Sequence, residues 1–129
     1  MASTYARRMP IARPLAVVVD CLDPSVLVPF WQAMVGGETD QATLEDDWVA
    51  LKGVEGIGYL AFQRVPEGRA AKNRLHLDLE VGDIVAATAE AVALGARPLG
   101  GVVDEITNLL QVLADPEDNE FCLIQRTPR

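Results

Sequence analysis

An internal repeat with a spacing of about 60 residues is the sequence feature that most constrains the fold. Asp23 and Asp83, each able to cap a helix, lie 60 residues apart, and residues 62–66 (Phe-Gln-Arg-Val-Pro) match residues 124–128 (Ile-Gln-Arg-Thr-Pro) at a spacing of 62. Both halves also show the same predicted order of one strand, one helix and three strands. Because all these signals repeat at a spacing of about 60 residues, they predict a duplicated βαβββ module.

The elements of each module are predicted from hydrophobic periodicity and from helix and turn signals. In module one, residues 14–66, a strand, a helix and three strands are expected at 15–20, 26–35, 42–44, 48–52 and 58–65. In module two, residues 74–128, they are expected at 74–80, 84–94, 97–99, 109–114 and 120–125. The strand at 74–80 is the clearest, because Leu75, Leu77 and Leu79 alternate with polar residues and predict one apolar and one polar face. The expected fold class is α+β.

Charge restricts the possible partners. The 129 residues have a net charge of −8, with 11 Lys and Arg against 19 Asp and Glu. Binding to nucleic acid or to an anionic membrane needs a surplus of cations, so neither is an expected partner. No apolar run approaches the roughly 20 residues that span a bilayer. The length fits one domain, expected at 14–128.

The N-terminal residues and the cysteines indicate in which cellular compartment the protein is expected. Residues 1–13 contain three arginines and no acidic residue, which predicts a flexible basic arm. This arm lacks the apolar core of a secretory signal. Cys21 and Cys122 are too few for a disulfide framework, so free thiols and a cytoplasmic location are expected.

Five short segments, spread over both modules, carry a resemblance to a known family. They are 19–24 (Val-Asp-Cys-Leu-Asp-Pro), 30–31 (Phe-Trp), 61–67 (Ala-Phe-Gln-Arg-Val-Pro-Glu), 72–79 (Lys-Asn-Arg-Leu-His-Leu-Asp-Leu) and 115–121 (Asp-Pro-Glu-Asp-Asn-Glu-Phe). Over about residues 13–128 the chain resembles the vicinal oxygen chelate superfamily of glyoxalases, extradiol dioxygenases and bleomycin- and fosfomycin-resistance proteins, above all its glyoxalase-like domains. The last segment is similar to the family's Asp-Pro-x-Gly-Asn turn, with Asp118 at the usual glycine. Because Asp tolerates a left-handed backbone, we expect the turn to form.

The resemblance implies an architecture and an assembly. In this family the strands of each module curl into a half-open cup of mixed sheet, the helices cover the outer face, and two cups make one pocket. The pocket forms within one chain or across a dimer by module exchange, and a homodimer is expected here.

The resemblance also implies four positions for a divalent metal, two in each module. They correspond in this chain to Ala16, Leu60, His76 and Cys122. Alanine and leucine cannot ligate a metal, so the family's metal site is not expected, and no cofactor is predicted. A rearranged set of His76, Asp78 and Glu120 is the alternative. Side chains at i and i+2 on a strand have Cβ atoms roughly 6–7 Å apart, which hinders convergence on one ion.

The predicted pocket combines these positions with their neighbours on the same strand faces. Its expected lining is Ala16, Asp20, Trp48, Leu60, Phe62, His76, Asp78, Glu80 and Cys122. His76, the only histidine, is the candidate general base and otherwise a ligand contact. The carboxylates would favour a cationic ligand, unless arginines such as Arg126 neutralise them.

Three functions are compatible with the sequence. The first is binding of a small organic molecule in the cup without a complete family metal site. The second is a metal-dependent lyase, isomerase or dioxygenase that uses a rearranged ligand set. The third is a purely structural partner module. The fold alone does not distinguish them, because one fold hosts many chemistries.

Overall fold

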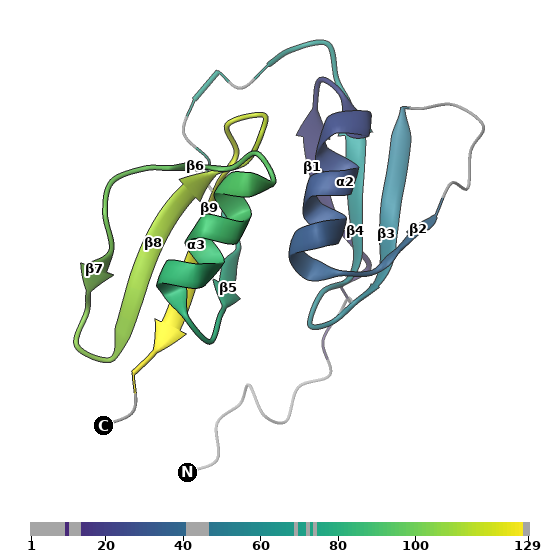
Figure 1. Ribbon diagram of the computed structural model, residues 1–129. Coiled ribbons are helices and arrows are strands. Elements are labelled where there is room, and N and C mark those ends of the chain that lie inside the picture. The colour runs from purple at the N-terminus through teal and green to yellow at the C-terminus, as the bar shows by residue number, and fades with distance from the viewer. Residues whose placement is uncertain are drawn as a thin grey trace.

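The computed structural model describes residues 10, 14–40, 47–68, 70–71, 73 and 75–127. Module one contains β1 (Val17–Cys21), α2 (Pro24–Val35), β2 (Glu38–Asp40), β3 (Trp48–Val54) and β4 (Gly58–Arg64) (Figure 1). Module two contains β5 (Asp78–Glu80), α3 (Ile84–Ala93), β6 (Arg97–Pro98), β7 (Val103–Asp104), β8 (Asn108–Ala114) and β9 (Glu120–Arg126). The arm predicted at 1–13 lies, except for Pro10, outside the described residues, and so does the strand predicted at 42–44.

The two modules have the same sheet topology. The strand orders are β1-β4-β3-β2 and β5-β9-β8-β6, and in each sheet the first pair is parallel and the others are antiparallel. β7, which was not predicted, also pairs with β8, so β6 and β7 are two pieces of one strand position, separated by Gly100 and Gly101. The predicted α+β fold of repeated modules is confirmed.

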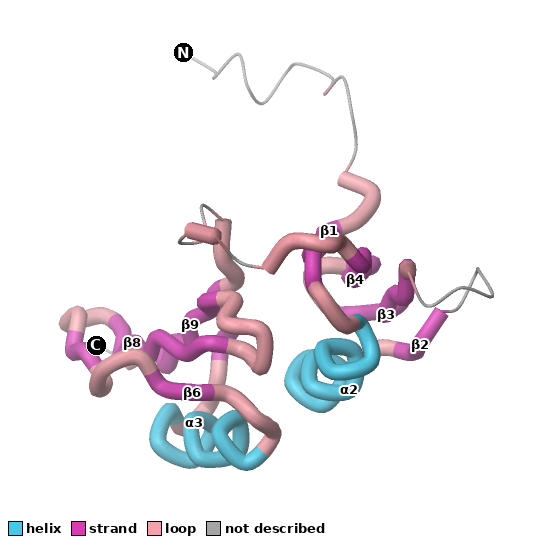
Figure 2. Tube along the Cα trace, turned by 90° about the horizontal axis from the view of Figure 1, so that it is seen from above, coloured by secondary structure: helices cyan, strands magenta, loops and turns pink. Residues whose placement is uncertain are grey.

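Both helices lie on the same side of the two sheets, as the view from above shows (Figure 2). The hydrophobic core fills the space between each helix and its sheet. Leu27 and Phe62 are fully buried in module one, and Ile84 and Leu123 are buried in module two. The opposite faces of the sheets therefore carry no helix in the described part of the chain.

The predicted helix caps are present. Asp23 precedes α2 and accepts a hydrogen bond from the backbone N–H of Ser25 at 3.0 Å. Asp83 precedes α3 and accepts from the backbone N–H groups of Val85 and Ala86. Pro24 occupies the first turn of α2, where no intrahelical N–H is needed, so α2 begins two residues before the predicted start.

The strand predicted at 74–80 is shorter than expected. Only Asp78–Glu80 pairs with β9, and Leu75 is 88% exposed. Leu77 and Leu79 pack against the core, so the predicted alternation of faces holds from residue 76 onward. The contact with β9 continues to Leu77, whose carbonyl accepts a hydrogen bond from the Cys122 N–H at 2.9 Å, although residues 76 and 77 are not part of the strand.

The turn between β8 and β9 forms as expected. Asp118 adopts a left-handed backbone with φ of 67°, and its N–H donates to the carbonyl of Asp115 at 2.9 Å. The Asp115 carboxylate accepts hydrogen bonds from the backbone N–H groups of Glu117 and Asn119. Aspartate thus replaces the usual glycine without loss of the turn.

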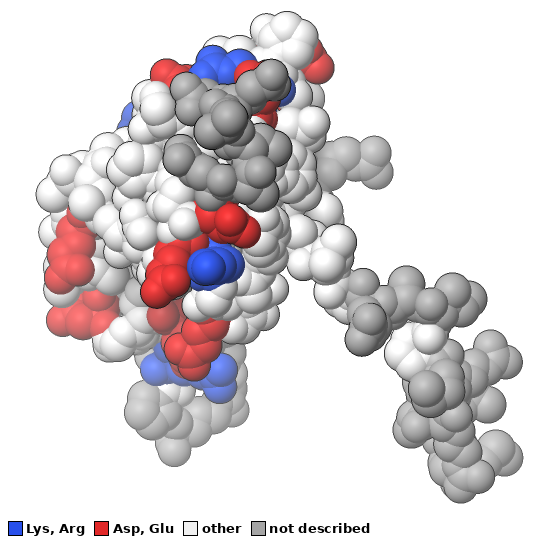
Figure 3. All heavy atoms as spheres, turned by 90° about the vertical axis from the view of Figure 1, so that its right-hand side faces the viewer, with Lys and Arg blue, Asp and Glu red and all other residues white. Residues whose placement is uncertain are grey.

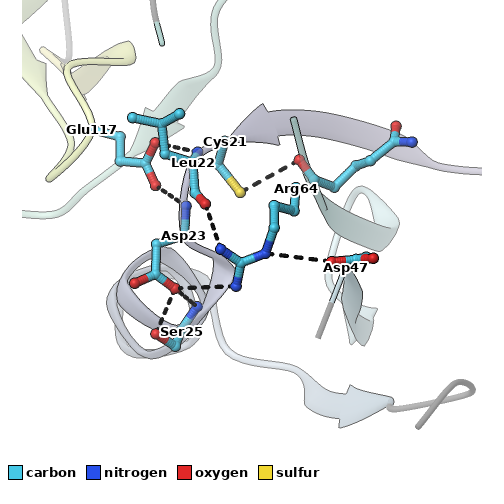
Figure 4. Close-up of polar contacts among 8 residues, drawn as sticks. Cys21, Leu22, Asp23, Ser25, Asp47, Arg64 and Glu117 are labelled. Atoms are coloured by element: carbon cyan, nitrogen blue, oxygen red, sulfur yellow. Dashed lines mark hydrogen bonds and ion pairs between the residues drawn. The ribbon is translucent and has the colours of Figure 1, made fainter. Parts of the chain in front are cut away.

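This turn also joins module two to the start of α2. The carboxylate of Glu117 accepts hydrogen bonds from the backbone N–H groups of Leu22 at 2.7 Å and Asp23 at 2.9 Å (Figure 4). Arg64 donates to the Leu22 carbonyl and forms ion pairs with Asp23 and Asp47. The seam between the modules is therefore polar at this end.

Acidic side chains form several patches on the surface of the molecule, and basic side chains lie beside some of them (Figure 3). Within the described part of the chain, neither α2 nor α3 is long and apolar enough to cross a membrane.

Candidate functional site

Strand register decides which side chains of module two face away from α3. Asp78 lies opposite Cys122, and Glu80 lies opposite Ile124, in the parallel pair of β5 and β9. The intervening residues, such as Leu79 and Leu123, pack into the core beneath α3. Because successive side chains alternate between faces, the polar set is displayed on the open face of the sheet.

A cavity of about 620 Å³ occupies this open face. We call it the module-two cavity. Its lining consists of Asn73, His76, Asp78, Glu80, Glu105, Asn108, Leu110, Val112, Glu120, Cys122, Ile124 and Arg126. This lining brings together four residues that were predicted for the pocket, namely His76, Asp78, Glu80 and Cys122. The lining combines aliphatic side chains with polar ones, which is typical of a small-molecule site.

Four of the described lining residues are acidic, namely Asp78, Glu80, Glu105 and Glu120, and one is an arginine. Arg126 forms an ion pair with Glu80, with Nε and Oε2 2.7 Å apart. The predicted neutralisation by arginine therefore applies to Glu80. Asp78 and Glu105 add further negative charge to the described lining, which favours a positively charged ligand.

His76, Asp78 and Cys122 converge in this cavity. His76 Nε2 lies 3.2 Å from Asp78 Oδ1, and the donor atoms of all three side chains lie within 4.8 Å of one another. Burial raises the pKa of the Cys122 thiol, and the neighbouring Asp78 carboxylate raises this pKa further. The expected difficulty of bringing together side chains at i and i+2 does not arise, because His76 precedes β5 and is not held in its ladder.

The predicted counterpart of Cys122 in module one is corrected from Leu60 to Ala61. In the strand pairs, Val18 lies opposite Ala61, and its repeat equivalent Asp78 lies opposite Cys122. Leu60 is fully buried on the helix-covered face and only borders a second cavity. A register error of one residue moves a side chain to the other face of a sheet.

The same register places Phe62 in the core rather than in the pocket, since it is fully buried with Leu60. Trp48, at the start of β3, is half-buried, and Ala16, just before β1, is also half-buried. Neither of them is among the described residues that line the two cavities. Of the residues predicted in module one, the structure places only Asp20 and Leu60 at a cavity.

The second cavity, of about 570 Å³, lies at the seam between the modules. Asp20 and neighbouring β1 residues line one side, and the turn from Asp115 to Phe121 lines another. His76, Asn73 and Glu120 border both cavities, so the two spaces meet at these residues. The single pocket expected from the sequence is therefore two adjoining cavities in the described structure.

The module-two cavity also contains polar residues that were not predicted from the sequence: Glu105, Asn108 and Asn73. A regular alternation of polar and apolar residues along β8 would have assigned Asn108 to the open face of the sheet. Gln111 is polar but lies on the opposite face, so it breaks this alternation. Gln111 is only 3% exposed, and its buried side-chain amide is satisfied because it donates hydrogen bonds to the carbonyls of Gly100 and Val112. Glu105 is placed by the β7–β8 turn, for which the sequence offered no signal.

The two modules differ in whether their side chains could hold the family's metal. The four-residue site does not fit, because Ala16 and Ala61 supply no ligand atom in module one. The three donors of module two do fit the residue types that bind zinc: one imidazole, one carboxylate and one thiol. Among the described residues, a set of three such donors that lie close to one another occurs only in module two.

A family model described as a glyoxalase-like domain matches residues 16–124. Among solved structures, a glyoxalase/bleomycin resistance protein/dioxygenase family enzyme from Burkholderia phytofirmans PsJN is 17% identical with a TM-score of 0.75, and the match covers 90% of this chain and 100% of that chain. The fosfomycin resistance protein FosX from Listeria monocytogenes is 13% identical with a TM-score of 0.73, covering 92% and 96%.

TioX from Micromonospora sp. ML1 is 15% identical with a TM-score of 0.60, and the match covers 89% of this chain and 97% of that chain. No curated protein matches this chain. At these identities the structural likeness shows the fold alone. The family model spans both modules, and the structure repeats their topology. The chain therefore belongs to the family of glyoxalase-like domains within the vicinal oxygen chelate superfamily.

Proposed function

We propose that this protein binds a small organic cation in the module-two cavity. The observation that carries the proposal is the acidic lining of this cavity, in which Asp78, Glu80 and Glu105 outnumber the single described arginine and lie beside aliphatic side chains. Leu110, Val112 and Ile124 supply apolar surface for a hydrocarbon or aromatic group. A ligand with one cationic end and one apolar end would match both parts.

The size of the cavity supports a small molecule as the ligand. Its volume of about 620 Å³ lies within the range of roughly 300–1,000 Å³ of small-molecule sites. Several of the similar solved structures are named as resistance proteins, for bleomycin or fosfomycin. Sequestration of an organic compound is a function that this fold can perform without chemistry. The homodimer and the cytoplasmic location stay predictions.

The test compares benzylamine, benzyl alcohol and benzoate, which have one aromatic group and differ in charge at pH 7. Ligand-observed NMR titration should show benzylamine binding at least tenfold more tightly than benzoate, with benzyl alcohol between them. Added salt should weaken benzylamine binding, because mobile ions screen the carboxylates. Equal binding of all three compounds, or no binding of benzylamine at millimolar concentration, would contradict the proposal.

Two variants with the same change in charge separate the cavity from the general surface. Glu105→Gln removes one carboxylate of the cavity, and Glu90→Gln removes an exposed carboxylate on α3. We expect the first to weaken benzylamine binding several-fold and the second to leave it unchanged. Equal effects would mean that net charge, rather than the cavity, controls binding.

A second function, that of a metal-dependent enzyme, is favoured by one observation: the convergence of His76, Asp78 and Cys122. In this role the metal would act as a Lewis acid toward a bound substrate. The substrate would decide which class of reaction such a site catalyses. Binding of a metal can be measured before any activity is known.

A further inference from the structure

We infer that the ligand of this protein is an amphipathic amine, with its cationic end in the module-two cavity and its apolar tail in the cavity between the modules. We call this second space, which has a volume of about 570 Å³, the seam cavity. The inference rests on the proposed function, from which it takes the cationic end. It adds that the apolar end is a chain long enough to leave the module-two cavity.

The two cavities adjoin, so one ligand can occupy both. Asn73, His76 and Glu120 line the module-two cavity and also the seam cavity. The side chain of His76 is 51% exposed, and its Nε2 lies 3.2 Å from the Asp78 carboxylate, so solvent surrounds much of the imidazole at this junction. The cavities have similar volumes, about 620 and 570 Å³. A ligand confined to one of them would therefore leave a space of similar size to water.

More than half of the described residues that line the seam cavity are apolar. Val17 and Val18 come from β1, and Leu75 comes from the chain that precedes β5. These three residues are 39%, 44% and 88% exposed, although their side chains are large and apolar. No lysine or arginine occurs among the described residues of this lining. An apolar tail would remove this surface from water, and burial of apolar surface is a dominant favourable term in binding.

The carboxylates of the seam cavity are mostly outnumbered or already bonded. Buried Asp115 accepts a hydrogen bond from the Trp31 indole N–H at 3.0 Å, and Glu117 accepts hydrogen bonds from two backbone N–H groups at the start of α2. Asp20 and Glu67 also line this cavity and are exposed. The apolar residues outnumber these two carboxylates several-fold, which assigns the tail of the ligand, rather than its charged end, to the seam cavity.

A homologous series of amines tests the tail. Butylamine, hexylamine and octylamine carry the same ammonium group at pH 7 and differ only in chain length. Ligand-observed NMR titration of the full-length protein should show about threefold tighter binding for each buried methylene, and octylamine binding at least tenfold more tightly than butylamine. Affinity that does not rise with chain length would overturn the inference.

Two matched valine variants test whether the tail lies in the seam cavity. Val18→Thr keeps a β-branched side chain in β1 but makes this part of the lining polar. Val85→Thr makes the same change on α3, at an exposed position that lines neither cavity. We expect Val18→Thr to weaken octylamine binding about threefold and to leave butylamine binding unchanged, whereas Val85→Thr should change neither affinity.

Two leucine variants repeat this comparison outside the strands. Leu75 and Leu15 are 88% and 89% exposed, and of the two only Leu75 lines the seam cavity. Leu75→Ser should weaken octylamine binding, and Leu15→Ser should not. Octylamine binding that neither Val18→Thr nor Leu75→Ser weakens, or that the control variants weaken equally, would overturn the inference.

The position of the cationic end is tested with one further variant and two analogues. Glu105→Gln should weaken butylamine and octylamine binding by the same factor, because both compounds share the charged end and the change lies in the module-two cavity. Octanol should bind several-fold more weakly than octylamine, and 1,8-diaminooctane should bind no more tightly than octylamine. A more tightly bound diamine would overturn the inference, since it would place a second charge in the seam cavity.

These measurements separate failure of the inference from failure of the proposed function. If affinity is independent of chain length while benzylamine still binds more tightly than benzoate, the inference is overturned and the proposed function stands. If octanol binds as tightly as octylamine, both are overturned, because the positive charge then has no role in binding.

Discussion

The indole N–H of Trp31 donates a hydrogen bond of 3.0 Å to the carboxylate of Asp115, and both residues are buried. Trp31 belongs to α2 of module one, whereas Asp115 begins the turn between β8 and β9 of module two. The Trp31 ring also contacts Phe121 edge-on at 5.0 Å between centroids. A buried polar contact and an aromatic contact thus hold the two modules together at this point.

Replacement of Trp31 by phenylalanine should destabilise the protein. The variant keeps an aromatic ring but leaves the buried Asp115 carboxylate without this donor. Loss of a hydrogen bond to a buried charged group costs about 1–3 kcal/mol. Urea unfolding of Trp31→Phe measures the change, with Trp48→Phe, at a half-buried position, as the control. Equal stability of Trp31→Phe and the wild type would show that the contact contributes nothing.

Asp115 should make stability depend on pH in the acid range. Burial raises the pKa of its carboxyl above the ordinary value of 3.8, against the hydrogen bonds from Asn119, Trp31 and Glu117 that favour the ionised form. A raised pKa in the folded state means that the folded protein binds the proton more tightly. The contribution of Asp115 to stability is therefore greatest below pH 3.8 and declines as the pH rises through the folded pKa.

Unfolding free energies measured in urea at several pH values test this sign. Asp115→Asn should remove the decline. Asp23→Asn is the control with the opposite expectation, because hydrogen bonds from Ser25 lower the pKa of Asp23. The Asp23 contribution is present above its unfolded pKa and is lost as the pH falls. The same pH dependence of stability in both variants would contradict the opposite pKa shifts of Asp115 and Asp23.

Ile106 should be a site of backbone strain. It adopts φ of 72° in the turn between β7 and β8, a conformation that a β-branched residue rarely takes, and its side chain is 77% exposed. Glycine carries no Cβ, so Ile106→Gly should stabilise the protein by about 1 kcal/mol. Ile106→Ala keeps the Cβ and is the control that should not share this gain. Thermal unfolding measures both variants, and a less stable Ile106→Gly would refute the strain.

Cys21 should resist thiol reagents in the folded protein. Burial, and then the nearby negative charge of Glu117, raises the pKa of its thiol to about 12, so the reactive thiolate is scarce at pH 8. In Cys122→Ser, which leaves Cys21 as the single thiol, colorimetric titration with a disulfide reagent should be slow in buffer and rapid in urea. Rapid labelling in buffer would show that the thiol is accessible and ionised.

Local features of the fold were predictable from the sequence because they depend on neighbours along the chain. Asp23 and Asp83 cap their helices through backbone N–H groups two or three residues away. Asp118 enters the left-handed region within its own turn. The duplication could be recognised because both copies kept these local signals, and it was enough to predict the α+β fold.

The candidate site depended on relationships that only the tertiary structure decides. A shift of one residue between repeats exchanged Ala61 for Leu60, because side chains alternate between the faces of a sheet. Cys122 meets Asp78 only through the pairing of β5 and β9, between residues 44 positions apart in the chain. The sequence by itself determined the modules, their caps and the family; the sheet register and the packing of the two modules determined which side chains share a cavity, since those contacts join residues that the chain places far apart.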